Sequence, residues 1–249
     1  MSNLISIVIP FYKKKFFFSE TIKSILIQSY KNFEIILIYD DSSRKDLIFV
    51  KKILRKIKKK KIIINKKNLG VGASRNIGIK SAKGNFIAFL DSDDIWHKDK
   101  LKKQLNFMKK NKINFSYTDY LIINENGKII KKIKAPKRIE YNDLLYSCDI
   151  GLSSVMVSSK LLKLESFPNI KTKEDYILWL KLSKKRVKML GINKPLTYWR
   201  KTSGSLSSSI TQKLKDAFIV YNKYLKFNIY KSLIFTSILS LNFIKKRYL

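Results

Sequence analysis

Short apolar runs alternate with longer amphipathic stretches in the first part of the chain. The runs with the length and β-branched content of buried strands are 4–9, 33–39, 61–65 and 86–90. Between them, apolar residues at helical spacing predict a helix capped by Ser19, a helix over 46–58 and a helix over 71–82. Strands that alternate with helices predict βαβ units and a parallel sheet that is covered on both faces.

The pattern loosens after residue 111. Strands are predicted at "INFSYTDY", "GKIIKKIKA", 153–159 and "PLTYWR", and an amphipathic helix is predicted over 173–185. From about residue 210 the chain is expected to be helical and basic. These elements predict an α/β domain over 1–205, followed by a C-terminal amphipathic helical extension over 206–249.

Composition sets the broad class of the protein. With 249 residues and 45% hydrophobic content, the chain can bury a substantial core, and it is not wholly disordered. Cys148 is the only cysteine, which excludes an intramolecular disulfide framework, fits a reducing compartment and favours a buried, unreactive thiol. The N-terminal segment lacks the basic region and cleavage site of a signal peptide, and it predicts a strand instead.

The strong positive charge has two interpretations. The chain carries 53 Lys and Arg against 18 Asp and Glu, a net charge of +35, which is typical of proteins that bind nucleic acid or anionic membranes. Only 7 of these cations are Arg, however, and abundant Lys, Ile and Asn indicate a coding bias toward AT-rich codons. We therefore treat most of the charge as background, expect no nucleic-acid partner, and expect some attraction to acidic lipid.

Acidic residues cluster against this basic background. The three groups are Asp40-Asp41, Asp91/Asp93/Asp94 and Glu174-Asp175. The first two follow predicted parallel strands, and the carboxyl edge of such a sheet is where ligands bind. Like charges this close repel one another unless a cation lies between them or some are protonated. Helix capping by Asp40, Asp94 or Asp99 is the structural alternative, although a cap needs one acid rather than two or three.

The sequence Asp91-Ser92-Asp93 at a strand end suits a hard divalent cation. Mg²⁺ and Mn²⁺ prefer oxygen ligands, take one or two protein carboxylates and keep positions open for phosphate oxygens. We therefore predict a Mn²⁺ or Mg²⁺ cofactor. His97, the only histidine, could contact the metal or a phosphate, but a surface or capping position beside a helix start is favoured.

Four glycines, at 70, 72, 78 and 84, surround the predicted helix over 71–82. Flexible backbone at a helix N-terminus favours phosphate binding, but the spacing matches neither a Gly-x-Gly-x-x-Gly loop nor a Walker loop. Arg75 lies in the first turns of that helix. On spacing alone it is equally a nucleotide contact or an exposed side chain.

Four segments occur in a familiar order and spacing. They are "SIVIPFY", "QSYKNFEIILIYDDSS", "NLGVGASRNIGIKSAKGNFIAFLDSDDIW" and "KEDYILWLKL". Together they resemble family 2 glycosyltransferases, nucleotide-diphosphosugar enzymes with the GT-A fold, and the resemblance covers about residues 4–205. It implies a mostly parallel central α/β sheet flanked by helices, and an enzyme of bacterial surface-polysaccharide biosynthesis.

The resemblance implies roles for residues on the donor side of the site. Pro10 and Tyr12 would line the nucleoside pocket, and Asp41 would hydrogen-bond the base, usually uracil. Arg75 would lie near the nucleotide, and Arg200 would neighbour the diphosphate.

The resemblance also implies the chemistry. Asp93 would ligate the metal that bridges the diphosphate, with Asp91 as a further ligand or facing the ribose or donor sugar. Asp175 would match the general base of inverting enzymes, which takes the proton of the acceptor hydroxyl as the new bond forms. The metal and nearby cations would stabilise the charge on the departing nucleoside diphosphate.

Two positions depart from the family's pattern. Lys13 follows Tyr12 where Asn is usual, and Ser42 replaces the Gly of the usual acidic motif. Neither change removes a carboxylate, so we expect altered loops and retained chemistry. The run of three lysines and three phenylalanines over 13–18 has no explanation from the sequence.

The C-terminal segment 227–249 is strongly apolar and ends in a basic cluster. Its uncharged stretch, 232–244, has 13 residues, about 20 Å as a helix, which is too short for a hydrocarbon core of ~30 Å. A helix on the membrane surface and a helix packed on the domain or on a second copy both remain open. The resemblance favours the membrane, and predicts a cytoplasmic enzyme that is peripheral on the inner face of the plasma membrane.

The resulting prediction is an inverting, metal-assisted glycosyltransferase of the hexosyl- or N-acetylhexosaminyl-transferase class. Its donor would be a nucleotide-diphosphosugar, most often a UDP-sugar, and its acceptor a glycan or a lipid-linked glycan. The alternatives are a charge-driven nucleic-acid-binding protein, whose affinity would fall steeply with salt, a nucleotidyltransferase on a related fold, and a catalytically silent binding module.

Overall fold

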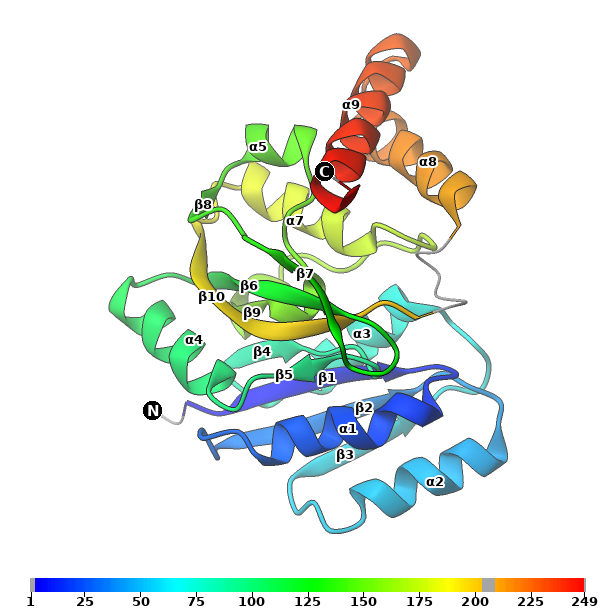
Figure 1. The fold of residues 1–249 in the computed structure, drawn as a ribbon, viewed down its shortest axis with the longest axis vertical. Helices are drawn as coiled ribbons and strands as arrows, with labels where there is room; N and C mark the ends of the chain where they lie inside the picture. The colour runs from blue at the N-terminus through cyan, green and yellow to red at the C-terminus, as the bar shows by residue number, and fades with distance from the viewer. Residues whose placement is uncertain (1–2, 203–208, 249) are drawn as a thin grey trace.

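The computed structural model describes residues 3–202 and 209–248, in which one large sheet carries helices on both faces (Figure 1). The strands are β1 (Ile5–Phe11), β2 (Phe33–Tyr39), β3 (Lys60–Ile64), β4 (Phe86–Phe89), β5 (Ile95–Trp96), β6 (Phe115–Ile123), β7 (Ile129–Ile133), β8 (Arg138–Ile139), β9 (Met156–Ser158) and β10 (Met189–Arg200). They hydrogen-bond in the order β3-β2-β1-β4-β9-β6-β10-β5, with β7 paired to β6 and β8 paired to β10.

The N-terminal half of the sheet is parallel. Strand β1 pairs with β2 and β4, and β2 pairs with β3, all in parallel register. Strand β9 runs antiparallel to β4 and β6, whereas the long strand β10 is parallel to β6. Most of the paired residues belong to the parallel ladders, which confirms the prediction of a mostly parallel α/β sheet.

Helices cover both faces of the sheet. They are α1 (Lys15–Leu26), α2 (Arg44–Leu54), α3 (Val71–Ser81), α4 (Lys100–Lys110), α5 (Tyr141–Tyr146), α6 (Ser159–Leu162), α7 (Glu174–Lys184), α8 (Ile210–Ile219) and α9 (Ile229–Tyr248), with short helices η1 (Leu152–Ser154) and η3 (Val220–Tyr224). Alternate side chains of β1 point to opposite faces, so Ile7 packs in a core with α1, α2 and α4. Val8 packs in the other core, with α3 and α7.

Helix α1 begins before the predicted cap, so the expectation that Ser19 starts this helix is wrong. The apolar stripe of the helix begins at Phe18 and continues through Ile22 and Ile25, and all three side chains are buried. An amphipathic helix that buries Phe18 must already be formed at that residue. The other predicted elements differ from the structure mainly at their ends; β10, for example, starts before the predicted strand. Cys148 is exposed, so the prediction of a buried thiol is also wrong.

The C-terminal helices pack on the α/β domain. The buried carboxylate of Asp216 in α8 accepts hydrogen bonds from the backbone N–H and the hydroxyl of Thr172, at 2.9 and 2.7 Å. The Tyr221 hydroxyl in η3 donates to the carbonyl of Leu145 at 2.8 Å. The Asn242 amide in α9 donates to the Tyr146 carbonyl at 2.9 Å. The packing interpretation of the tail therefore holds for one side of these helices.

The predicted boundary between 1–205 and 206–249 lies outside the described residues, so it stays a prediction. Within residues 3–202 and 209–248, no helix is long and apolar enough to cross a membrane. Helices α8 and α9 lie at the opposite end of the molecule from α2 (Figure 1).

Candidate active site

Three parallel strands deliver candidate residues to one edge of the sheet. Strands β2, β1 and β4 are neighbours, so the residues that follow them emerge at the same carboxyl edge. Tyr12 follows β1, Asp40 follows β2, and Asp91 comes shortly after β4. The third acidic pair, Glu174-Asp175, begins α7 and is brought to this edge by its contact with Arg75.

Arg75 joins two of the three acidic groups. Its Nη2 donates to Asp91 Oδ1 at 2.7 Å, and its Nη1 donates to Glu174 Oε1 at 2.5 Å. The Arg75 side chain is only 3% exposed, so the alternative of an exposed arginine is wrong. Burial opposes the charge of the guanidinium, but the carboxylates of Asp91 and Glu174 outweigh it and raise the pKa of Arg75. The guanidinium therefore stays charged between the two acids.

Local sequence explains how α3 approaches the segment before α7. A Cβ atom at Gly72 would lie 2.9 Å from the carbonyl oxygen of Pro168, so only glycine permits this approach. The Asn76 side chain then holds the contact, because its amide donates to the Phe167 carbonyl and its oxygen accepts from the Phe167 N–H, both at 2.9 Å. These contacts place Arg75 opposite Glu174.

The two acids after β2 organise the neighbouring loops. Asp40 is buried and accepts hydrogen bonds from the backbone N–H groups of Leu69 and Gly70, at 2.8 and 2.9 Å, so it fixes the loop that enters α3. Asp41 is half-buried and accepts from the N–H of Lys13 at 2.9 Å and of Ser43 at 3.1 Å. Ser43, not Asp40, caps α2, which rules out the capping alternative for Asp40.

Asp93 and Asp94 have different environments. Asp93 Oδ2 lies 2.9 Å from the ammonium of Lys14, and its side chain is 14% exposed. Burial raises the pKa of Asp93, and the charge of Lys14 opposes that rise. Asp94 is buried, and its Oδ1 accepts from the backbone N–H of Arg200 at 2.9 Å. Burial, and then the charges of Asp93 and Asp91, raise the pKa of Asp94 well above its ordinary value.

Arg200 lies beneath this turn with its guanidinium fully engaged. Its Nε donates to the Asp93 carbonyl at 2.9 Å, its Nη1 donates to the Glu125 carbonyl at 2.8 Å, and its Nη2 pairs with Glu20. The guanidinium also lies over the Phe17 ring, 4.8 Å from the centroid. In this arrangement Arg200 supports the backbone of the acidic turn, and its side chain is buried, at 1% exposed, against these partners.

The two acids at the start of α7, Glu174 and Asp175, both have raised pKa values. Burial raises the pKa of Glu174 to about 7 although the charge of Arg75 opposes the rise. Burial also raises the pKa of Asp175, again against the charge of Arg75. Asp175 Oδ1 accepts from the N–H of Tyr176 at 2.7 Å in the first turn of the helix. A raised pKa brings a carboxylate closer to the range in which it can exchange protons at neutral pH.

Three further candidates lie nearby or beside the site. Pro10 is buried within β1, whereas Tyr12, just past the strand, is 42% exposed at the carboxyl edge. His97 Nδ1 accepts from the backbone N–H of Asp99 at 3.1 Å at the start of α4. His97 therefore lies half-exposed beside the start of the helix, where the favoured interpretation expected a surface or capping residue, and the N-cap residue itself is Asp99.

Comparison with known proteins identifies the family. The family model described as glycosyl transferase family 2 matches residues 6–167, which include Tyr12, Asp41, Arg75, Asp91 and Asp93. This chain belongs to glycosyltransferase family 2. Asp175 and Arg200 lie beyond the matched residues. An Escherichia coli protein named as the UDP-Glc:α-D-GlcNAc-diphosphoundecaprenol β-1,3-glucosyltransferase WfgD is 38% identical over 224 residues, which cover 90% of this chain and 87% of WfgD.

Solved structures share the fold of this glycosyltransferase. Residues 1–349 of Staphylococcus aureus TarS, in complex with UDP-GlcNAc, match with a TM-score of 0.75 and 20% identity over 98% of this chain and 76% of that one. The mannosyltransferase PcManGT of Pyrobaculum calidifontis, in complex with GDP-Man and Mn²⁺, matches with a TM-score of 0.69 and 12% identity over 98% and 75%. The predicted GT-A fold is confirmed.

The glycosyltransferase offers a limited donor set for a metal. Among the described residues, no group of three or more His, Cys, Asp and Glu side chains is arranged to hold an ion. The carboxylates of Asp91 and Asp93 instead contact Arg75 and Lys14. Two carboxylates nevertheless fit Mg²⁺ or Mn²⁺, because these ions commonly complete their coordination with water and phosphate oxygens. Asp91 and Asp93 would hold such an ion together with a bound diphosphate.

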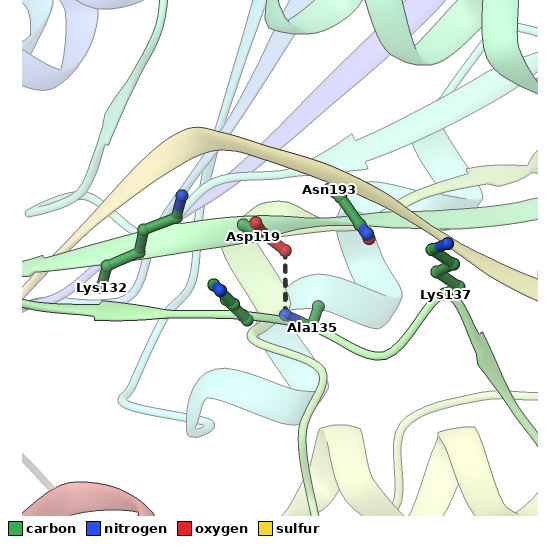
Figure 2. Close-up of a pocket in the computed structure, with 6 residues that line it drawn as sticks. Asp119, Lys132, Ala135, Lys137 and Asn193 are labelled. Atoms are coloured by element: carbon green, nitrogen blue, oxygen red, sulfur yellow. Dashed lines mark hydrogen bonds between the residues drawn. The ribbon is translucent and has the colours of Figure 1, made fainter.

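A basic pocket lies away from these acids. It has a volume of about 370 Å³ and is lined by Asp119, Lys132, Lys134, Ala135, Lys137 and Asn193. Figure 2 shows the Asp119 carboxylate hydrogen-bonded to the backbone N–H of Ala135, at 2.9 Å, and Lys132 and Lys137 beside it. Asp119 is thus engaged in holding the segment that forms the pocket wall. None of the predicted site residues lines this pocket.

Two residues at the site were not among the sequence predictions. Glu174 belongs to one of the three acidic groups of the sequence, but its pairing with Arg75 depends on the packing of α3 on the segment before α7. Lys14 lies in the unexplained run over 13–18, and nothing in its sequence neighbourhood points to Asp93, which is far away along the chain. The departure from the family pattern at Lys13 is the one feature of the sequence that sets this run apart.

Proposed function

We propose that this glycosyltransferase transfers a hexose from a UDP-sugar to a hydroxyl of a lipid-diphosphate-linked glycan, with inversion at the anomeric carbon and with a divalent metal. The likeness to WfgD, whose name specifies UDP-Glc and a diphosphoundecaprenol-linked GlcNAc, supports the classes of donor and acceptor. We place the reaction in the assembly of a bacterial surface polysaccharide.

The observation that carries this proposal is the bridge made by Arg75. The bridge joins Asp91, on the proposed donor side, to Glu174, the neighbour of Asp175. Asp91 and Asp175 are 84 positions apart in the sequence. The bridge nevertheless brings the proposed donor site and the proposed general base into one charged cluster. A cluster of this kind is what a bimolecular transfer requires.

In the proposed mechanism, the nucleotide lies at the carboxyl edge of β1 and β2. Tyr12 lines the nucleoside pocket with the end of β1 at Pro10, and Asp41 accepts a hydrogen bond from the base. Asp91 and Asp93 would hold a divalent metal ion together with the diphosphate, and that ion would stabilise the negative charge on the leaving diphosphate. Arg75 keeps Asp91 in position.

Asp175 acts on the acceptor. Its carboxylate takes the proton of the acceptor hydroxyl as the oxygen forms a bond to the anomeric carbon, while the bond from that carbon to the UDP oxygen breaks. Attack opposite the leaving group inverts the anomeric centre, so an α-linked donor gives a β-linked product. The raised pKa of Asp175 allows it to hold this proton during the reaction.

The reaction is tested with purified full-length protein, Mn²⁺, a panel of nucleotide sugars and a short-chain lipid-diphosphate GlcNAc acceptor. The proposal predicts UDP release from a UDP-hexose that depends on metal and acceptor, and a β-linked disaccharide by NMR. Release of pyrophosphate would favour the nucleotidyltransferase alternative. Failure to consume any nucleotide sugar would contradict the proposal.

We also propose that the enzyme is cytoplasmic and peripheral on the inner face of the plasma membrane, and that it binds the membrane through α9. One side of α9 packs on the domain, whereas apolar side chains on the other side are 50–80% exposed: Ile229, Tyr230, Leu233, Ile234, Leu241 and Ile244. Their spacing puts them on one face of the helix. Lysines border this face, at Lys231 and Lys245, which suits anionic lipid.

Flotation with vesicles tests the membrane contact. The double variant Leu233→Asp/Ile234→Asp is expected to lose binding to vesicles that contain anionic lipid and to retain its fold by circular dichroism. Ile48→Asp, which changes a 61% exposed residue on α2, is the control and is expected to bind like the parent. Equal binding by all three proteins would contradict the proposal.

A further inference from the structure

Lys14 occupies the position of a counter-ion for the predicted metal ligand. Its ammonium lies 2.9 Å from Asp93 Oδ2 and donates to the Thr202 hydroxyl at 2.6 Å. The Asp93 carboxylate is 14% exposed, and a carboxylate with so little contact with water is costly without a cation. In the structure, the Lys14 ammonium therefore supplies the positive charge that the Asp93 carboxylate needs.

The run over 13–18 is built around this contact. Lys13 has a left-handed conformation, with φ of 52°, and its N–H donates to Asp41. Lys14 follows at the start of α1, and Phe17 lies under Arg200, which in turn supports the Asp93 backbone. Phe18 packs edge-on against Phe11, with the ring centroids 5.2 Å apart, and anchors the helix. The contacts of Lys13, Phe17 and Phe18 thus fix the backbone from which the Lys14 side chain extends.

We propose that Lys14 is a displaceable counter-ion that couples metal binding to donor binding. In the empty enzyme its ammonium holds the Asp93 carboxylate and competes with a divalent cation for the same oxygens. When a diphosphate arrives with its cation, the flexible lysine side chain exchanges Asp93 for diphosphate oxygens. This inference rests on the proposed donor site, and it adds a residue and an order of events that the site residues alone do not imply.

Two consequences distinguish this role from a merely structural ion pair. First, Mn²⁺ binds weakly to the nucleotide-free enzyme. It must displace the Lys14 ammonium from Asp93 while no diphosphate is present to accept that ammonium. Second, UDP and Mn²⁺ strengthen each other's binding, because the diphosphate gives that ammonium new oxygen partners. Removing the Lys14 side chain reduces this coupling, because Mn²⁺ alone then binds more tightly and UDP alone binds more weakly.

The experiment measures Mn²⁺ binding to nucleotide-free protein by electron paramagnetic resonance, and UDP binding by calorimetry with Mn²⁺ or with EDTA. Lys14→Ala is expected to bind Mn²⁺ alone about 5- to 100-fold more tightly than the parent, the usual range of coupling between two ligands. It is expected to bind UDP in EDTA more weakly. Lys15→Ala is the matched control, because the Lys15 ammonium instead pairs with Asp46, at 3.1 Å. This control is expected to behave like the parent.

Further variants keep the result decisive. In an Asp93→Asn background, Lys14→Ala is expected to leave Mn²⁺ affinity unchanged, because the shared ligand is gone. Lys14→Gln keeps a hydrogen-bond donor for Thr202 and replaces Lys14→Ala if the latter unfolds. Equal Mn²⁺ affinity of the parent and the Lys14 variants, with Mn²⁺–UDP still bound, would overturn this inference alone. Absence of Mn²⁺–UDP binding in every protein, the parent included, would overturn the proposed function and this inference with it.

Discussion

The guanidinium of Arg75 lies 2.7 Å from the carboxylate of Asp91, although one residue belongs to a helix and the other to the turn after a strand. The same guanidinium contacts Glu174. A chain with few acids can therefore keep several of them together, because it places its own cations between them. Lys14 does the same for Asp93.

Arg75→Ala is expected to destabilise the protein by about 3–5 kcal/mol, since it leaves two buried or half-buried carboxylates without their partner. Urea unfolding followed by circular dichroism measures this change. Arg55→Ala alters an exposed arginine after α2 and is expected to remain within about 0.5 kcal/mol of the parent. An Arg75→Ala variant as stable as that control would show that the bridge contributes nothing to folding.

Asp93→Asn is expected to weaken binding of Mn²⁺–UDP, because an amide is a neutral and poorer ligand than a carboxylate for a hard cation. Calorimetric titration of UDP in the presence of Mn²⁺ measures the loss. Asp99→Asn, at a half-buried acid paired with Lys103, serves as the control. If both variants bind as the parent does, Asp93 is not a metal ligand.

Asp41→Ala is expected to reduce UDP affinity and to retain the fold, since the residue is half-buried at the edge of the sheet. Asp46→Ala removes a neighbouring acid of α2 that contacts Lys15 instead, so it tests for a general effect of charge. Equal UDP dissociation constants for the two variants and the parent would remove Asp41 from the base pocket.

Glu174 gives the protein a specific dependence on pH. Burial raises the pKa of this carboxyl to about 7, above its value in the unfolded chain, so the folded state binds the proton more tightly. The contribution of Glu174 to stability is therefore present below about pH 4.5 and is lost as the pH rises toward 7.

The comparison with Glu174→Gln isolates that contribution, because glutamine stays neutral and can still accept a hydrogen bond from Arg75. The free energy of unfolding of the parent is expected to fall relative to that of the variant by about 1–3 kcal/mol between pH 4.5 and pH 7. Urea unfolding at a series of pH values provides the measurement. Parallel curves for the two proteins would contradict the raised pKa.

Sequence patterns were sufficient to predict the parallel strands of the sheet and the edge at which the acids lie. Strands β1, β2 and β4 are short apolar runs, and parallel pairing sends the residues after them to one side. That rule places Asp41 and Asp91 at the same edge of the sheet without any knowledge of side-chain contacts.

The partners of those acids were not predictable in the same way. Arg75 reaches Glu174 only because Gly72 and Asn76 let α3 approach the segment before α7. Arg200 was expected at a diphosphate, yet it lies under the acidic turn, because its guanidinium finds backbone carbonyls and Glu20 there. Such contacts depend on tertiary packing, which residue spacing alone does not encode.

The most direct test of the central claim is sugar transfer by Asp175→Asn. Asparagine keeps the size of the side chain and its acceptor for the Tyr176 N–H, but it cannot take the proton of the acceptor hydroxyl. We expect kcat for transfer to fall by roughly 10²–10⁴-fold, while the dissociation constant of the UDP-sugar with Mn²⁺ stays near that of the parent. The parent should give a β-linked product from an α-linked donor. Near-normal turnover by Asp175→Asn, or an α-linked product from the parent, would contradict the inverting mechanism with Asp175 as its base.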